Sequence, residues 1–199
     1  MTPNSDPDRR AQILAQATDY VLEHGLNDLS LRPLAAVLGT SGRMLIYYFG
    51  SKDQLVLDIL AEARRRQYVD LALAAADENV LRRYWTWVSS PQGRRFLRLT
   101  HEIYGRSLRE PERFGGFLAS EAIEVLAEIE ASFRHAGVAA PHARLLSTYT
   151  FATLRGLELD LLGTDDLARV QAAFDLFEAD LQRRTEQFAH ASPRKEGTT

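Results

Sequence analysis

The stretch GTSGRMLIYYFGSKDQL, residues 39–55, encloses a short apolar segment between glycines and serines. Gly39 and Gly50 favour the left-handed backbone that commonly ends a helix. Ser41 and Ser51, by contrast, belong to the residue types preferred at the start of a helix. These signals predict that one helix ends at Gly39, that a short helix lies between Ser41 and Gly50, and that a longer one begins at Ser51.

The short helix, expected over residues 42–48, has two different faces. Leu45, Tyr48 and Phe49 are spaced at i, i+3 and i+4, so they share one side and are expected to pack on neighbouring helices. Two short helices joined by a glycine turn indicate a helix-turn-helix, whose second helix enters the major groove of DNA. Tyr48 stays open between a core position and a DNA contact. The outward ridge of this motif is expected to contain Thr40, Ser41, Arg43, Met44 and Tyr47.

Helix signals continue on both sides of this motif. A first helix is expected to begin with Asp6 as its N-cap and to end at Gly25, and a second is expected to begin at Ser30. Ser51 and Gln54 form a capping box at the start of the longer helix, which is expected to reach residue 77. Apolar residues recur every three or four positions along the remaining sequence, and alternating β-branched runs are missing. The sequence predicts an all-α fold.

The outward ridge has the chemistry of nucleic-acid recognition. Arg43 carries a planar guanidinium that fits the O6 and N7 atoms of guanine. Gly42 removes a side chain where the backbone is expected to approach DNA. Lys52 lies in the first turn of the following helix, so its ammonium and the unpaired amides there are expected to converge on one phosphate.

These residues resemble the TetR (tetracycline-repressor) family of bacterial transcription regulators. The usual family pattern is a Gly-Val-Ser turn followed by Leu-Tyr-Tyr-His-Phe, a small residue, Ser and Lys, and residues 39–55 are similar over nearly their whole length. The upstream LRPLAAVLG resembles the second helix of the family. Ile46 and Tyr48 stand where a tyrosine and a histidine are usual. The resemblance implies DNA contacts from Arg32, Thr40, Ser41, Gly42, Arg43, Tyr47, Tyr48 and Lys52, and Met44 lies on the same ridge.

Charge limits how strongly such a motif binds DNA. The 199-residue chain has a formal net charge of −3, and residues 1–60 hold five basic and seven acidic side chains. Four of the five cations are expected to face the DNA, with Asp19, Glu23 and Asp28 behind. Because each neutralised phosphate adds about 0.9 to the salt slope, we expect weak non-specific binding and a modest slope.

The middle of the chain is rich in aromatic residues. Helical spacing places a stripe within residues 96–104 beside a later stripe within residues 118–133. Such faces enclose either a small-molecule pocket or a solid aromatic core, and the family resemblance implies an inducer site in this region. The candidate effector-binding residues are Trp87, Phe96, Thr100, His101, Tyr104, Phe117 and Tyr149.

The last two predicted helices carry more apolar surface than one neighbour covers. Residues 144–163 are apolar on two sides, and a helix of this kind must be covered on two sides. The final helix repeats apolar residues at the three- and four-residue spacing of a helix-pairing seam. We expect a two-fold homodimer built as a four-helix bundle, with intrachain packing as the alternative. The predicted interface contains Tyr149, Ala152, Gly156, Leu167, Val170, Phe174, Phe177 and Leu181.

Several classes of function have no support in the sequence. The chain lacks cysteine, which excludes disulfides and thiolate metal sites. Its polar start and the lack of an apolar run of about 20 residues predict a cytoplasmic protein with no membrane partner. His101 and Glu102 begin a zinc-protease pattern, but Gly105 occupies the place of the second histidine. We predict no cofactor, no metal and no enzymatic activity.

The predicted organisation is a DNA-binding domain over residues 1–51 and an effector-binding and dimerisation domain over residues 52–190. The helix at 51–77 links the two, and residues 191–199 are expected to be a disordered tail. The sequence indicates a dimeric regulator that binds a palindromic operator through residues 41–48 and is released by a small, mainly apolar molecule. The family resemblance implies that it acts as a repressor. The alternative is a helical small-molecule-binding protein or enzyme without sequence-specific DNA binding.

Overall fold

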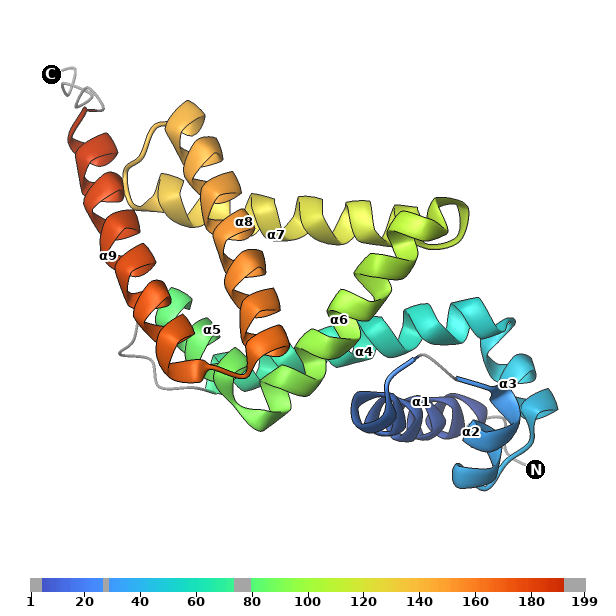
Figure 1. Ribbon diagram of the computed structural model, residues 1–199. Coiled ribbons are helices and arrows are strands. Elements are labelled where there is room, and N and C mark those ends of the chain that lie inside the picture. Colours follow the sequence, from blue (N-terminus) through green and yellow to red (C-terminus); the bar gives the residue numbers. More distant parts are fainter. Residues whose placement is uncertain (1–4, 27–28, 74–79, 192–199) are drawn as a thin grey trace, which may run out of the picture. The chain divides into compact units, whose positions relative to one another are not determined.

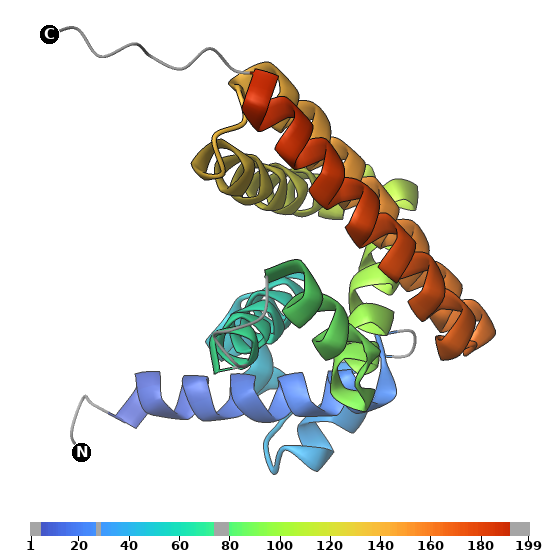
Figure 2. The same cartoon turned by 90° about the vertical axis from the view of Figure 1, so that its left-hand side faces the viewer.

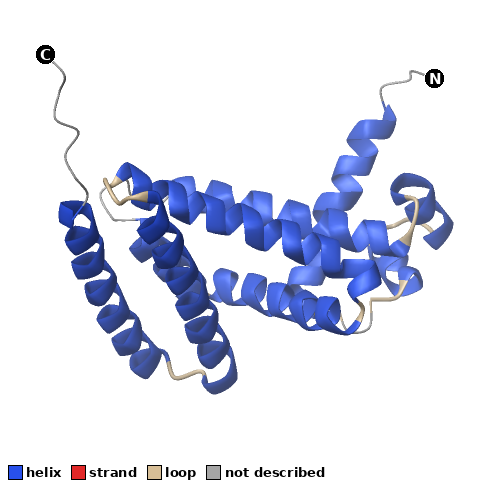
Figure 3. Cartoon of the chain, turned by 90° about the horizontal axis from the view of Figure 1, so that it is seen from above, coloured by secondary structure: helices blue, strands red, loops and turns tan. Residues whose placement is uncertain are grey.

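The computed structural model describes residues 5–26, 29–73 and 80–191, and every regular element within these ranges is helical (Figure 3). This confirms the all-α prediction for the described part of the chain. The chain divides into two compact units, residues 1–116 and 117–199, and each is described by itself. The predicted disordered tail lies outside the described residues from 192 onward, as does the expected helix end at residue 77.

The first unit contains the predicted helix-turn-helix. Helix α1 contacts both α4 and α6, while α3 contacts α2 and α4 (Figure 1). Ile13 of α1, Leu45 of α3 and Ile59 of α4 are fully buried, so these three helices share one core. Its elements are α1 (Ser5–His24), α2 (Leu31–Val37), α3 (Gly42–Phe49), α4 (Lys52–Leu73), α5 (Val80–Ser89), α6 (Pro91–Arg109) and the π-helix η1 (Pro111–Gly115).

The predicted start of the first helix is wrong by at least two residues. Helix α1 already includes Ser5, so Asp6 lies inside the first turn and is not the N-cap. Pro7 is tolerated there because first-turn amides have no intrahelical partner. The predicted end is confirmed, since Gly25 has a φ of +78° directly after His24.

The boundary proposed at residues 51 and 52 does not coincide with the edge of a compact unit. Leu55, Val56 and Ile59 of α4 are buried, and α4 packs on α1 within the first unit. Because α4 shares the core of the helix-turn-helix, a displacement of α4 affects the seating of α3. The assignment of separate DNA-binding and effector functions on either side of Ser51 stays a prediction.

The turn between α5 and α6 is unusually close. Ser90 caps α6 by accepting a hydrogen bond from the Gly93 amide at 3.1 Å. A Cβ atom added at Gly93 would lie 2.1 Å from the carbonyl oxygen of Trp87 and 2.6 Å from the Cα atom of Val88. Glycine is therefore the residue that allows α6 to begin directly against the backbone of α5.

The second unit is built on two long antiparallel helices. Its elements are α7 (Gly116–His135), whose first residue still belongs to the first unit, α8 (Ala140–Thr164) and α9 (Leu167–Ala191). Figure 2 shows α8 and α9 running side by side along their length, and the two are in contact. Asp165, in the left-handed conformation with a φ of +54°, makes the tight turn between them.

The apolar stripe of the final helix faces the same chain. Val170, Phe174, Phe177 and Leu181 were expected at the dimer interface, but all four are buried within one protomer. Their spacing fits the pairing of α9 with α8, so a pattern that allowed either partner is satisfied by the intrachain one. Tyr149 and Leu167, which were also expected at the interface, are exposed, as are Leu145, Leu159 and Leu176 of this helix pair.

Among the described residues, no helix combines the length and apolarity that crossing a bilayer requires.

Candidate nucleic-acid interface

The turn between α2 and α3 is fixed by backbone hydrogen bonds. The amide of Thr40 donates to the carbonyl of Ala35 at 2.9 Å, and the amide of Gly39 donates to the carbonyl of Ala36 at 3.3 Å. This pair of bonds is a Schellman motif, which requires the positive φ of +61° at Gly39. The prediction that the second helix ends at Gly39 is confirmed.

The capping prediction holds at α3 and fails in part at its neighbours. The hydroxyl of Ser41 accepts a hydrogen bond from the Met44 amide at 3.2 Å and so caps α3. Ser30 occupies the N-cap position of α2, but its side chain makes no capping bond. Ser51 accepts from the Gln54 amide at 3.0 Å, which is only half of the predicted capping box. The side chain of Gln54 is instead bound to the carboxylate of Asp58, one turn along α4.

Helix α3 has the two faces that the sequence predicts. Leu45 is 0% exposed and Phe49 is 3% exposed, so both anchor the helix in the core. Tyr47 is 67% exposed on the opposite side, and Arg43 is also exposed there. Tyr48 is half-buried between the two faces. The outward ridge predicted from the sequence is therefore present in the folded chain. Arg43 and Tyr47 at its centre provide a cation and a phenol.

Three exposed cations on this unit are available to a partner. Arg32 on α2, Arg43 on α3 and Lys52 on α4 are exposed, and none forms an ion pair with the described residues. The remaining predicted contacts come from the same segments: Ser41 and Met44 are exposed, whereas Thr40 and Gly42 are half-buried. Cations and hydrogen-bonding groups thus lie on three consecutive elements of one compact unit.

Arg10 is the cation of this segment that binds groups of the protein itself. Its Nε atom donates to the carbonyl oxygen of Tyr48 at 3.1 Å, and its guanidinium lies 4.8 Å from the centre of the Phe49 ring. It also forms an ion pair with Asp58 of α4. Arg10 therefore ties the end of α3 to α1 and α4, and holds the recognition helix in place.

Two arginines of α4, Arg65 and Arg66, are engaged with acids of the protein. Arg65 and Arg66 both bind Glu62, and Arg66 also pairs with Asp19 of α1 at 2.5 Å. The hydrogen bond from Arg65 is the main cause that lowers the pKa of Glu62 to about 2. Burial of the carboxyl group acts in the opposite direction, and the hydrogen bond from Arg66 lowers the pKa further. Arg65 and Arg66 are therefore occupied by acids of the protein itself.

The sequence of the helix-turn-helix segment is similar to that of a known protein family. Residues 13–59 match the sequence profile of the bacterial regulatory proteins, tetR family. This match covers α1 from its first buried residue through the buried half of α4, and includes the whole ridge described above. Residues 13–59 are therefore similar to the DNA-binding segment of TetR-family regulators.

Solved structures of other proteins share the fold over most of the chain. A transcriptional regulator from Rhodococcus sp. Rha1 has a TM-score of 0.68 at 18% identity, covering 92% of this chain and 96% of that one. GusR from Salmonella enterica has a TM-score of 0.69 at 19% identity, covering 94% and 98%. The multidrug binding protein EbrR, in complex with imidazole, has a TM-score of 0.61 at 26% identity, covering 88% and 94%. A search of curated proteins gives no significant match.

The candidate effector residues of the first unit lie on α5 and α6. Trp87 and Phe96 form an edge-to-face pair with ring centres 5.4 Å apart, and Trp87 also donates to Asp70 at 3.3 Å. Phe96 and Thr100 are buried and Tyr104 is exposed. His101 directs Nδ1 to the carbonyl of Leu97 at 2.8 Å. Tyr149 belongs to the second unit, and the side chain of Phe117 lies outside the described residues. These assignments to an effector site stay a proposal.

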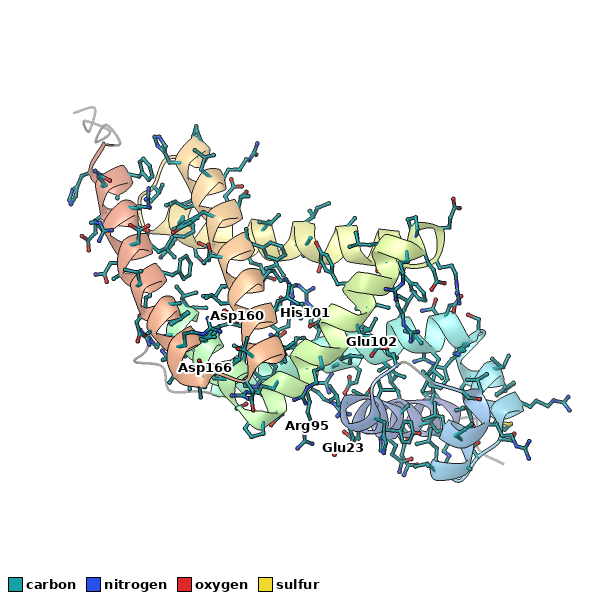
Figure 4. The ribbon with its side chains drawn as sticks, in the orientation of Figure 1. Glu23, Arg95, His101, Glu102, Asp160 and Asp166 are labelled. Carbon is teal, nitrogen blue, oxygen red and sulfur yellow. The ribbon has the colours of Figure 1, made fainter. Side chains whose placement is uncertain are left out.

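The sequence did not reveal the hydrogen bonds and the ion pair that hold α6 against the end of α1. Glu102 accepts from the Leu26 amide at 2.9 Å, and Arg106 donates to the Leu26 carbonyl at 2.7 Å. Glu23 of α1 and Arg95 of α6 form a further pair at 2.7 Å, with their side chains close together in Figure 4. The i, i+4 spacing of Glu102 and Arg106 is readable in the sequence, but their common partner lies about 80 residues away.

Proposed function

We propose that this protein is a homodimeric TetR-family repressor in the cytoplasm that binds a palindromic operator and is released by a small, mainly apolar effector. The observation that carries the proposal is the outward face of α3, where Arg43 and Tyr47 are exposed while Leu45 and Phe49 fix the helix from behind. The proposed role is regulatory, and no catalytic step is assigned to the chain.

Base recognition would centre on Arg43. Its guanidinium has no partner among the described residues, so both of its donor pairs are available to the O6 and N7 atoms of a guanine. Met44 and Tyr47 flank it with apolar surface, which suits the methyl group of a thymine. We therefore expect each half-site to contain a guanine next to a thymine, with Arg32 and Lys52 on the phosphates.

The proposed dimer would use the outward face of the α8–α9 pair. Leu145 is 65% exposed on α8 and Leu176 is 73% exposed on α9, and Tyr149 and Leu159 are also exposed. Nothing in the described chain lies within 4 Å of a Cβ atom added at Gly156, so a second helix has room to approach there. A two-fold axis through this face would present two α3 ridges to half-sites about one helical turn apart or somewhat more.

Effector release requires a connection between α6 and the DNA-binding helices. The contacts of Glu102, Arg106 and Arg95 with the end of α1 provide one within the first unit. A ligand that displaces α6 would strain these contacts, and its binding would be coupled to operator binding by about 1–3 kcal/mol. The complexes of EbrR with imidazole and with proflavin support a small aromatic molecule as the type of effector.

Selection of bound duplexes from a random pool tests this function. The full-length protein is incubated with 30-base-pair duplexes that carry a random centre, and the bound fraction is sequenced after several rounds at physiological salt. We expect an enriched motif with two-fold symmetry and a fixed spacing between half-sites. Enrichment of no sequence would overturn the proposal, and an asymmetric single site would overturn its dimeric form.

Substitution of Gly42 by alanine separates DNA binding from folding. An added Cβ atom would lie 3.7 Å from the Cβ atom of Leu31, which is ordinary van der Waals contact. Alanine also favours helix by up to about 1 kcal/mol over glycine, so the thermal stability should be equal or higher. If the backbone at Gly42 approaches DNA closely, operator affinity should nevertheless fall by about 1–3 kcal/mol. Calorimetric unfolding and fluorescence anisotropy with the selected duplex measure the two effects, and unchanged affinity would contradict the close approach.

A further inference from the structure

The first turn of α4 places a carboxylate next to the proposed phosphate contact. Lys52 and Asp53 are the first two residues of this helix. The amides of the first turn point out of its N-terminal end, which is also the positive end of the helix dipole. The hydroxyl of Ser51 accepts a hydrogen bond from the Gln54 amide, so the Lys52 and Asp53 amides remain available to a phosphate. An uncompensated carboxylate at Asp53 would oppose the approach of that phosphate.

A residue 60 positions further along the chain binds this carboxylate. Arg113 of η1 donates from Nε to Oδ2 of Asp53 at 3.0 Å and from an Nη atom to Oδ1 at 2.5 Å. Such a two-bond arrangement fixes the orientation of the carboxylate as well as its charge. Asp53 is therefore turned toward η1, and Lys52 forms no ion pair with the described residues.

The guanidinium of Arg113 is itself held in place. It lies 5.2 Å from the centre of the Phe114 ring, and Phe114 is buried. The hydroxyl of Ser107 on α6 donates to the carbonyl of Phe114 at 3.3 Å and links η1 to the preceding helix. Glu110 at the end of α6 shares the guanidinium with Asp53. The position of Arg113 thus depends on the end of α6.

We propose that Arg113 is a positioning residue for DNA binding, which acts by neutralising Asp53 and turning it away from the phosphate contact at Lys52. This inference rests on the proposed operator binding and adds to it a determinant outside the helix-turn-helix. It also follows that a displacement of η1 would release Asp53 and weaken DNA binding, even with α3 unchanged.

A charge cycle in the full-length protein tests the proposal. Arg113→Ala is expected to weaken binding to the selected operator about three- to tenfold at low salt. The double variant Arg113→Ala/Asp53→Asn should return to within about twofold of the wild type, since the repelling charge is gone. The loss in the single variant should shrink at 0.5 M salt, where the Debye length is well below 10 Å. Arg113→Lys should keep most of the affinity.

Arg109→Ala is the matched control. Arg109 is exposed in the last turn of α6, and removing it changes the net charge equally without touching an ion pair among the described residues. Equal losses in Arg109→Ala and Arg113→Ala would reduce the effect to net charge and overturn the proposal. A loss that Asp53→Asn does not rescue would show a purely structural role and would also overturn it.

A generic 30-base-pair duplex at low salt distinguishes failure of this inference from failure of the proposed function. If the protein binds duplex DNA without sequence preference, the proposed operator function fails. The affinities of the Arg113 and Asp53 variants are then measured on the generic duplex, where Asp53→Asn should again restore the affinity lost in Arg113→Ala. If the wild type binds no duplex at all, both proposals are overturned. If it selects an operator but the cycle shows no effect of Arg113, only the positioning role is overturned.

Discussion

Replacing Arg43 by alanine is expected to weaken binding to the selected operator by about 1–3 kcal/mol, or about five- to 150-fold. The side chain is exposed on α3 and has no partner among the described residues, so its removal breaks no contact within the protein. The whole effect should therefore appear in DNA binding. Preference at one base pair of each half-site should relax at the same time, because a bidentate contact to guanine is lost.

Fluorescence anisotropy titrations with the selected duplex and with its single-base variants measure both effects. Arg98→Ala on α6 is the matched control, since it removes an exposed cation with no partner among the described residues and leaves the ridge intact. Thermal unfolding of both variants should follow the wild type. A loss of affinity with unchanged base preference would place Arg43 on a phosphate and contradict its role in base recognition.

Replacing Gly93 by alanine is expected to cost about 3 kcal/mol or more of folding stability. The added Cβ atom would meet backbone atoms of Trp87 and Val88 at 2.1 to 2.8 Å, and a backbone cannot move aside as a flexible side chain does. Relief requires α6 to shift away from α5. Since α6 also contacts α1, the displacement should weaken the hold on Leu26 and lower operator affinity.

Gly105→Ala provides the control in the same helix. Its nearest new contact is the end of the Arg109 side chain at 3.7 Å, so the substitution should be neutral or stabilising by up to about 1 kcal/mol. Urea unfolding followed by circular dichroism measures the difference between the two variants. Equal stability of Gly93→Ala and the wild type would mean that the α5–α6 turn is wider than described.

Local signals predicted the recognition segment well because its geometry is decided within a few residues. Gly39 and Gly50 have positive φ angles, and Ser41 caps α3 with its own hydroxyl. Each of these features depends on the backbone within four positions of the residue concerned. Helical spacing likewise separated buried Leu45 from exposed Tyr47.

Features that depend on contacts between residues far apart in the chain could not be predicted from the sequence. The charge count did not identify which cation turns away from DNA, because the partners of Arg10, Asp58 and the Tyr48 carbonyl, lie 48 and 38 residues away. The stripe that contains Phe174 fitted either a second subunit or α8, and spacing alone does not distinguish the two. Nothing in the sequence indicated a role for Arg113, because only the folding of the chain brings η1 next to Asp53 at the start of α4.

A cycle between Arg43 and one base atom tests most directly whether the outward face of α3 reads DNA. The half-site guanine is replaced by 7-deazaguanine, which lacks the N7 acceptor, and both duplexes are titrated with the wild type and with Arg43→Ala. If Arg43 binds this guanine, the base change should weaken the wild type severalfold and leave the variant unaffected. Equal losses in both proteins at every guanine of the operator would contradict the assignment of α3 as the recognition helix.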